Sequence, residues 1–269
     1  MRLQALSIIG FVLFFISATY AHAYWLEPEK FILGLNEKTI VHLFVGDGLT
    51  KDREERPFQS SKTPRFDLFA GDSSVDLTPS MIDNVTPFYN FSADKQGTYL
   101  LATQRSWSFV KIESGKFEDY LRDEGMEYII AEREKLGERQ KEGRERYSRY
   151  IKSLLQVGDK RTNAYERNVG QRLEIMPLEN PYAKKPGDKL KFQILFDTKP
   201  LAGYTVFADN RDGTTQKITT DKHGKFSIKP DHIGLWLVRL VVMKRCTETD
   251  CGEADWQSFW GALTFGVAK

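Results

Sequence analysis

The closely spaced strand-like segments of the C-terminal part constrain the fold most. From Leu173 onward, about seven short segments rich in β-branched and aromatic residues follow one another within roughly a hundred residues, with turn residues between them. In the segment 190–197, alternate apolar side chains fall on one face by the period of two. This pattern predicts an immunoglobulin-like or prealbumin-like β-sandwich, and the lack of repeated βα units disfavours Rossmann and TIM architectures.

The N-terminal part shows the same strand pattern, interrupted by glycine-containing turns. The segments predicted as strands there are 39–45, 65–69, 97–102 and 106–112. We therefore expect a mainly β fold with two sandwich modules, residues 22–115 and 158–269.

Between these modules, the spacing of the apolar residues changes from the period of a strand to that of a helix. Residues 116–156 contain no proline and many charged residues. An apolar stripe at i, i+3, i+4, i+7 and i+8 is formed by Tyr147, Tyr150, Ile151, Leu154 and Leu155. This stripe is typical of an amphipathic helix, so residues 116–157 are predicted to form an inserted helical hairpin.

The first residues have the layout of a secretory signal peptide. Arg2 precedes an apolar run from about Leu6 to Ile16, and small residues follow it. The run is too short for a helix that crosses ~30 Å of hydrocarbon. We expect residues 1–21 to be removed and the mature chain, without a membrane-spanning segment, to be exported to the periplasm, or secreted where the source lacks one.

Two cleavage sites compete, and they give different mature N-termini. Cleavage after Ala21 leaves His22 first, whereas cleavage after Ala23 leaves Tyr24 first and fits the A-x-A rule better. The choice matters because an N-terminal histidine carries an α-amine and an imidazole on one residue.

Charge and cysteine content limit the partners and the compartment. The net charge of +2 becomes +1 without residues 1–21, whose single charged residue is Arg2. Near-neutrality without a basic cluster argues against a nucleic-acid partner. The two cysteines, Cys246 and Cys251, are close in sequence, and in an oxidising compartment they are expected to form a local disulfide.

Signatures of catalysis are scarce. The chain has no G-x-S-x-G elbow, H-E-x-x-H helix, P-loop or G-x-G-x-x-G turn. Its carboxylates leave open a hydrolase with an unrecognised acid pair. We expect a protein that is not an enzyme.

His22 is the first candidate metal ligand. If cleavage follows Ala21, the α-amine, whose pKa is near 8, and the imidazole chelate one metal through a single residue. This donor pair suits nickel, copper or cobalt. A hairpin between residues 27–33 and 39–45 would bring the N-terminus beside Asp47, the expected second ligand. His42 would then lie roughly 20 Å back along the ladder, and is the weaker third candidate.

The mature sequence resembles the bacterial domain-of-unknown-function family 4198, whose members are often labelled NikM-like. The start H-A-Y-W-L-E-P, residues 22–28, is similar to the family's H-x-F-W-L-E-P. Further similar segments are 116–125, 145–154, 173–182, 199–203, 220–224 and 254–265. The resemblance implies a periplasmic protein of two β-sandwich modules with a helical insertion, associated in some members with nickel or cobalt uptake.

Two classes of function follow from these patterns. The first is a non-enzymatic binding or accessory protein that passes a divalent metal to a membrane transporter. The alternative is a module that binds a carbohydrate or an envelope protein through exposed aromatic rings, with these candidate residues: Trp25, Trp107, Trp256 and Trp260. Burial of the rings in a sandwich core would remove this alternative.

Overall fold

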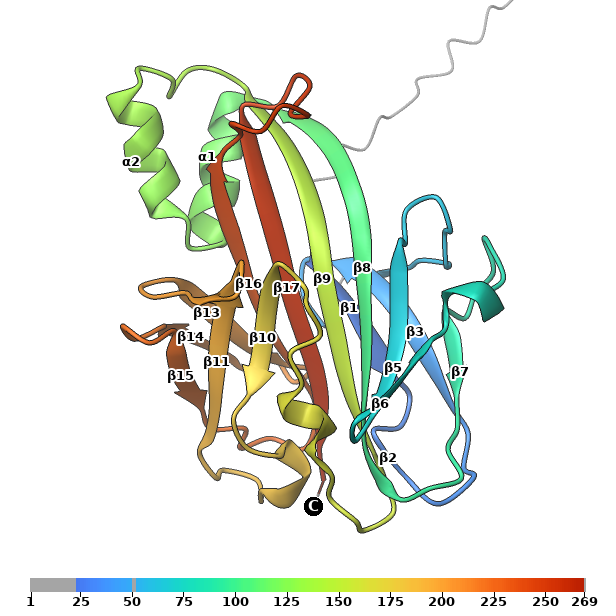
Figure 1. Ribbon diagram of the computed structural model, residues 1–269. Helices are drawn as coiled ribbons and strands as arrows, with labels where there is room; N and C mark the ends of the chain where they lie inside the picture. Colours follow the sequence, from blue (N-terminus) through green and yellow to red (C-terminus); the bar gives the residue numbers. More distant parts are fainter. Residues whose placement is uncertain (1–22, 50–51, 269) are drawn as a thin grey trace, which may run out of the picture.

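A long central sheet organises the chain (Figure 1). The computed structural model describes residues 23–49 and 52–268. The predicted signal peptide and His22 lie outside the described residues. The central sheet has nine strands, in the order β14 (Thr215–Thr219), β13 (Thr205–Asn210), β16 (Gly234–Arg245), β17 (Trp256–Val267), β9 (Gly143–Val157), β8 (Gly97–Ile112), β5 (Arg65–Ala70) and β6 (Ser73–Asp76), with β2 (Ile32–Leu33) also paired to β9.

Two smaller sheets cover opposite faces of the central one. One consists of β1 (Ala23–Pro28), β3 (Thr39–Gly46), β4 (Glu54–Glu55) and β7 (Tyr89–Phe91). The other consists of β10 (Leu173–Pro177), β11 (Leu190–Phe196), β12 (Lys199–Pro200) and β15 (Lys225–Ile228). Along β8, Leu101 packs in the core under β1 and β3, whereas its neighbour Leu100 packs in the core under β10 and β11. Adjacent side chains of a strand point to opposite faces, so the mainly β, sandwich-like prediction is confirmed.

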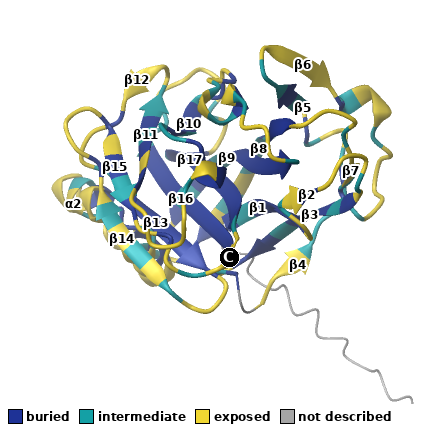
Figure 2. Ribbon diagram, turned by 90° about the horizontal axis from the view of Figure 1, so that it is seen from below, coloured by how far each residue is buried: buried dark blue, intermediate teal, exposed yellow. Residues whose placement is uncertain are grey.

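Several edge strands are exposed, and the centre of the nine-stranded sheet is buried on both faces. β4 and β12 are short and largely exposed, while the middle of the central sheet is buried throughout (Figure 2). Three 3₁₀ turns lie in connecting segments of the described residues: Thr78–Ser80, Asn163–Glu166 and Pro181–Ala183.

A pair of helices, α1 (Ser114–Asp123) and α2 (Glu127–Lys135), covers the end of the sheet where β8 leads into them (Figure 1). The Glu113 side chain accepts hydrogen bonds from the first backbone N–H groups of α1 and caps it. Tyr120 of α1 stacks on Trp260 of β17 at 5.9 Å between ring centroids. Phe117 lies so close to Gly143 that a Cβ there would come within 2.4 Å of the ring, which explains the glycine at the start of β9.

The prediction of a helix is wrong for the second half of the insertion. Residues 143–157 form strand β9, which pairs antiparallel with β8 and parallel with β17. Both faces of β9 are buried, so apolar residues occupy adjacent positions and do not alternate. The neighbours Tyr150 and Ile151 enter opposite cores, as do Leu154 and Leu155. Because these two adjacent pairs lie four residues apart, their spacing equals that of the apolar stripe on an amphipathic helix.

The two predicted modules share the central sheet. β9 and β8 come from the N-terminal part of the chain and β17 and β16 from the C-terminal part, yet they are neighbours in one ladder. The predicted segments 97–102 and 106–112 also join into the single strand β8, with a register shift between Arg105 and Ser108. The predicted boundary at residue 157 is therefore the end of a central strand.

The predicted disulfide is confirmed. Cys246 and Cys251 are bonded, with 5.9 Å between their Cα atoms, in the connection from β16 to β17. Three of the four candidate aromatic binders, Trp25, Trp256 and Trp260, are buried in the core. Within the described ranges 23–49 and 52–268, no helix is long and apolar enough to span a bilayer.

Ile151→Asp tests the position of β9. Ile151 is fully buried between β8 and β17, so an unpaired carboxylate there should lower the free energy of unfolding by about 3–5 kcal/mol. Val75→Asp on edge strand β6 is the matched control, because Val75 is 55% exposed and should change stability by less than about 0.5 kcal/mol. Equal urea midpoints for the two variants would contradict the two-faced burial of β9.

Candidate functional site

The start of β1 and the end of β3 form the first candidate site. Ala23 pairs with Gly46 and Glu27 pairs with His42, so a hairpin forms, but its first strand is residues 23–28, and residues 32–33, which were predicted to belong to it, pair with β9. A Cβ on Gly46 would lie 2.9 Å from the Arg53 Cα, so only glycine allows the chain to pass this close. Exposed Asp47 follows directly. The residue after His22 is therefore adjacent in space to the residue before Asp47.

His42 lies at the other end of this hairpin and is engaged with carboxylates. Its Nδ1 is 2.7 Å from a Glu55 oxygen, its Nε2 is 3.3 Å from a Glu29 oxygen, and its ring stacks on Phe44. Because both ring nitrogens face carboxylates, a metal would have to displace one of these contacts. Gly46 is four positions after His42 along β3, roughly 13 Å at ~3.3 Å per residue. The structure therefore does not bring His42 and Asp47 together.

Glu27 was missed by the sequence reasoning and connects three parts of the chain. Its carboxylate accepts hydrogen bonds from Trp25 Nε1 at 2.9 Å, from Arg53 Nη1 at 2.7 Å and from Arg211. Burial raises the pKa of Glu27, but these three donors outweigh burial and hold its pKa below the ordinary value. The Glu27 carboxylate thus joins β1, the chain before β4 and the β13–β14 turn. We call the cluster of Glu27, Trp25, Arg53 and Arg211 the Glu27 latch.

A cavity of about 640 Å³ opens beside this latch. Its walls come from β1, β3, the β13–β14 turn and the start of β16, with these side chains among them: Glu27, Phe31, His42, Phe44, Arg211 and Leu235. Its charged side chains include Glu27, Arg53 and Arg211, and Glu27 is paired with both arginines. Apolar side chains make up much of the remaining wall.

Two buried arginines also lie against Tyr24, the second residue of β1. The Tyr24 ring lies under the guanidinium groups of Arg149, at 4.0 Å, and Arg105, at 5.3 Å. Burial lowers the pKa of Arg105. Farther along the same face, the fully buried Glu145 accepts hydrogen bonds from Tyr120 Oη at 3.2 Å and from Ser258. These contacts fix the side chains next to the first described residue.

The pKa of Glu145 is raised to about 7 because burial outweighs the hydrogen bonds from Ser258 and Tyr120. One of its carboxylate oxygens has no hydrogen-bond partner in the described part of the chain. Neutral Glu145 avoids the cost of a buried charge. No group of three or more His, Cys, Asp or Glu residues in the described ranges is arranged to hold a metal.

Comparison with known proteins places this geometry in a family. A family model described as "Domain of unknown function (DUF4198)" matches residues 19–244. The chain belongs to the DUF4198 family. The match includes Glu27 of β1 and the central sheet up to β16, and ends before β17. Because the DUF4198 description names no activity, the nickel-related part of the resemblance stays a prediction.

Several solved structures are weakly similar to this DUF4198 chain. The D0-D1 domain of Intimin is 11% identical, with a TM-score of 0.21, and 90% of this chain and 97% of that chain are covered. Fibronectin(III)-like modules of Clostridium thermocellum CbhA are 10% identical, with a TM-score of 0.20 and coverage of 90% and 93%. A bacterial ice-binding adhesin is 9% identical, with a TM-score of 0.24 and coverage of 93% and 65%. No curated protein matches the chain.

Glu145→Gln should change how stability depends on pH. Because folding raises the pKa of Glu145 from 4.5 to about 7, the folded state loses stability as the pH rises across this window, by up to about 3 kcal/mol. The neutral amide should remove that loss, which urea unfolding at pH 5 and pH 8 would measure. Exposed Glu134→Gln is the control. An unchanged pH profile in Glu145→Gln would contradict the raised pKa.

Proposed function

We propose that this chain is a non-enzymatic periplasmic binding protein that takes up a divalent transition metal at the start of its mature chain. The observation that supports the site is the pairing of Ala23 with Gly46. Ala23 directly follows His22, and Gly46 directly precedes Asp47, so the pairing places the chain neighbours of His22 and Asp47 side by side. In an exported chain cleaved after Ala21, an amine, an imidazole and a carboxylate would then come from one end of the hairpin.

The donor set fits nickel, cobalt or copper. A set of two nitrogen donors and one carboxylate oxygen suits borderline first-row metals. Magnesium and calcium take mainly oxygen ligands and fit it less well. The described residues alone hold no metal cluster, so the proposed site depends on His22. Three donors leave coordination positions open, which suits a protein that passes its metal to a membrane transporter.

The test compares mature chains that start at His22 with chains that carry one extra alanine before it. Isothermal titration with nickel, cobalt and copper should show that the extension, or acetylation of the amine, weakens binding as much as His22→Ala does. Asp47→Asn should also weaken binding, whereas Asp72→Asn and His42→Ala should not. Affinity should fall between pH 8 and pH 6, because protons compete for the amine and the imidazole.

Three results would count against this proposal. N-terminal sequencing of the exported protein could begin at Tyr24. The extended and native chains could bind metal equally. His42→Ala could reduce the affinity more than His22→Ala does, which would move the site to the cavity beside the latch.

A further inference from the structure

A second cavity, of about 580 Å³, lies at the end of β8 nearest the helices. Its walls are formed by β8, by β9 and by the chain after Cys251. The lining side chains that matter here are Lys62, Trp107, Phe109, Lys111, Arg146 and Glu253. This volume is within the range of about 300–1,000 Å³ typical of small-ligand sites.

The register shift in β8 places aromatic rings at this cavity. An extra residue between Arg105 and Ser108 interrupts the pairing with β9, and such bulges redirect the side chains beside them. Trp107 is half-buried, and Phe109, which lies beyond the part of β8 that is paired with β5, is 44% exposed. The Trp107 ring is held by Arg146, whose guanidinium lies 4.3 Å from the ring centroid, and by the edge of Phe259.

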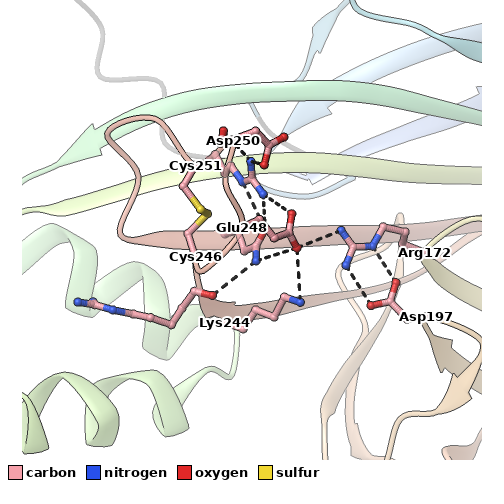
Figure 3. A network of polar contacts seen from close by, with 10 residues as sticks. Arg172, Asp197, Lys244, Cys246, Glu248, Asp250 and Cys251 are labelled. Carbon is pink, nitrogen blue, oxygen red and sulfur yellow. Dashed lines mark hydrogen bonds and ion pairs between the residues drawn. A yellow bond between two sulfur atoms is a disulfide. The ribbon is translucent and has the colours of Figure 1, made fainter.

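The disulfide loop fixes the opposite wall. Asp250 and Glu248 of the loop bind the Arg146 guanidinium at 2.8 Å and 2.5 Å. Glu248 also faces Arg172 and Lys244, and the Cys246–Cys251 bond closes the loop behind these contacts (Figure 3). Arg146 is therefore a buried, oriented cation behind Trp107, held by two carboxylates of a loop that the disulfide closes on itself.

The mouth of the cavity carries two lysines. Lys62 and Lys111 line it together with Glu253, whereas Asp250 is paired with the buried Arg146. Lys111 lies 2.8 Å from Glu253 and over the Phe109 ring, and both partners of this ion pair are exposed. Exposed ion pairs contribute little stability, so an incoming carboxylate can replace Glu253 beside Lys111 at small cost.

The geometry points to a binding site for an acidic carbohydrate, with a uronic acid ring stacked on Phe109 and Trp107 and its carboxylate bound by Lys62 and Lys111. Sugar rings present flat C–H faces that pack on aromatic rings, whereas the carboxylate requires the ammonium groups. A neutral sugar would use the rings alone. This site is separate from the proposed metal site and does not depend on it.

Tryptophan fluorescence tests the site directly. Of the five tryptophans, the four others, Trp25, Trp236, Trp256 and Trp260, are buried. Titration with a galacturonic acid trisaccharide should therefore change the emission of Trp107, with a dissociation constant below about 1 mM. A neutral galactose trisaccharide should bind at least about tenfold more weakly, and added salt should reduce the difference.

Matched variants separate the two parts of the site. Phe109→Ala should weaken uronate binding at least about tenfold, a typical loss for a stacking ring, whereas Ile82→Ala, also an exposed apolar residue, should not. Lys111→Gln should weaken it several-fold, whereas Lys30→Gln, which removes a similar exposed ion pair with Glu37, should have no effect. The double change Cys246→Ser and Cys251→Ser should weaken binding in a chain whose far-ultraviolet circular dichroism is unchanged.

The proposal is overturned if neither trisaccharide binds at about 10 mM. It is also overturned if the neutral sugar binds as tightly as the acidic one, or if Phe109→Ala and Ile82→Ala behave alike. Circular dichroism of each variant distinguishes loss of the site from loss of the fold, since Phe109 and Lys111 are exposed and their replacement should leave the spectrum unchanged.

Discussion

The architecture depends on the two-sided pairing of β9. This strand bonds to β8 along one edge and to β17 along the other, and its two faces lie in two different cores. With this pairing, the small sheets of the N-terminal and C-terminal parts cover opposite faces of one layer. The hairpin at the start of β1, the helical pair and the disulfide loop all take their positions from strands that β9 aligns.

Burial on both faces also explains the charged residues inside the protein. A strand in the middle of such a layer has no solvent face to which its polar side chains can turn. Lys152 of β9 is therefore paired with Glu174 of β10, and both are buried. Glu145 is hydrogen-bonded and its raised pKa favours the neutral form. The buried Arg133 instead donates hydrogen bonds to the carbonyl oxygens of Arg139 and Lys141. Ion pairing, protonation and hydrogen bonds to carbonyl groups thus each compensate buried charges, because an isolated charge in the interior is costly.

Local sequence patterns were sufficient to predict an element where one of its faces meets solvent. The alternation in residues 39–45 predicted β3 and its hairpin, and therefore the position of Asp47, because buried and partly exposed side chains alternate along that strand. The same reasoning mistook β9 for a helix, because a strand buried on both faces loses its period of two. The Glu27 latch could not be predicted either. Its partner Arg211 is 184 residues away in sequence, and only the W-L-E-P segment signalled that this stretch was unusual.

The parallel contact between β9 and β17 also determines the order in which the chain can fold. Arg146 and Gln257, neighbours across this contact, are 111 residues apart. During synthesis, β8 and β9 can pair early, but the second edge of residues 145–153 of β9 stays open until β17 emerges. An open apolar edge of this length invites pairing with other chains, and such long-range closure is slow. The chain is therefore prone to aggregation until β17 has been synthesised and has paired with β9.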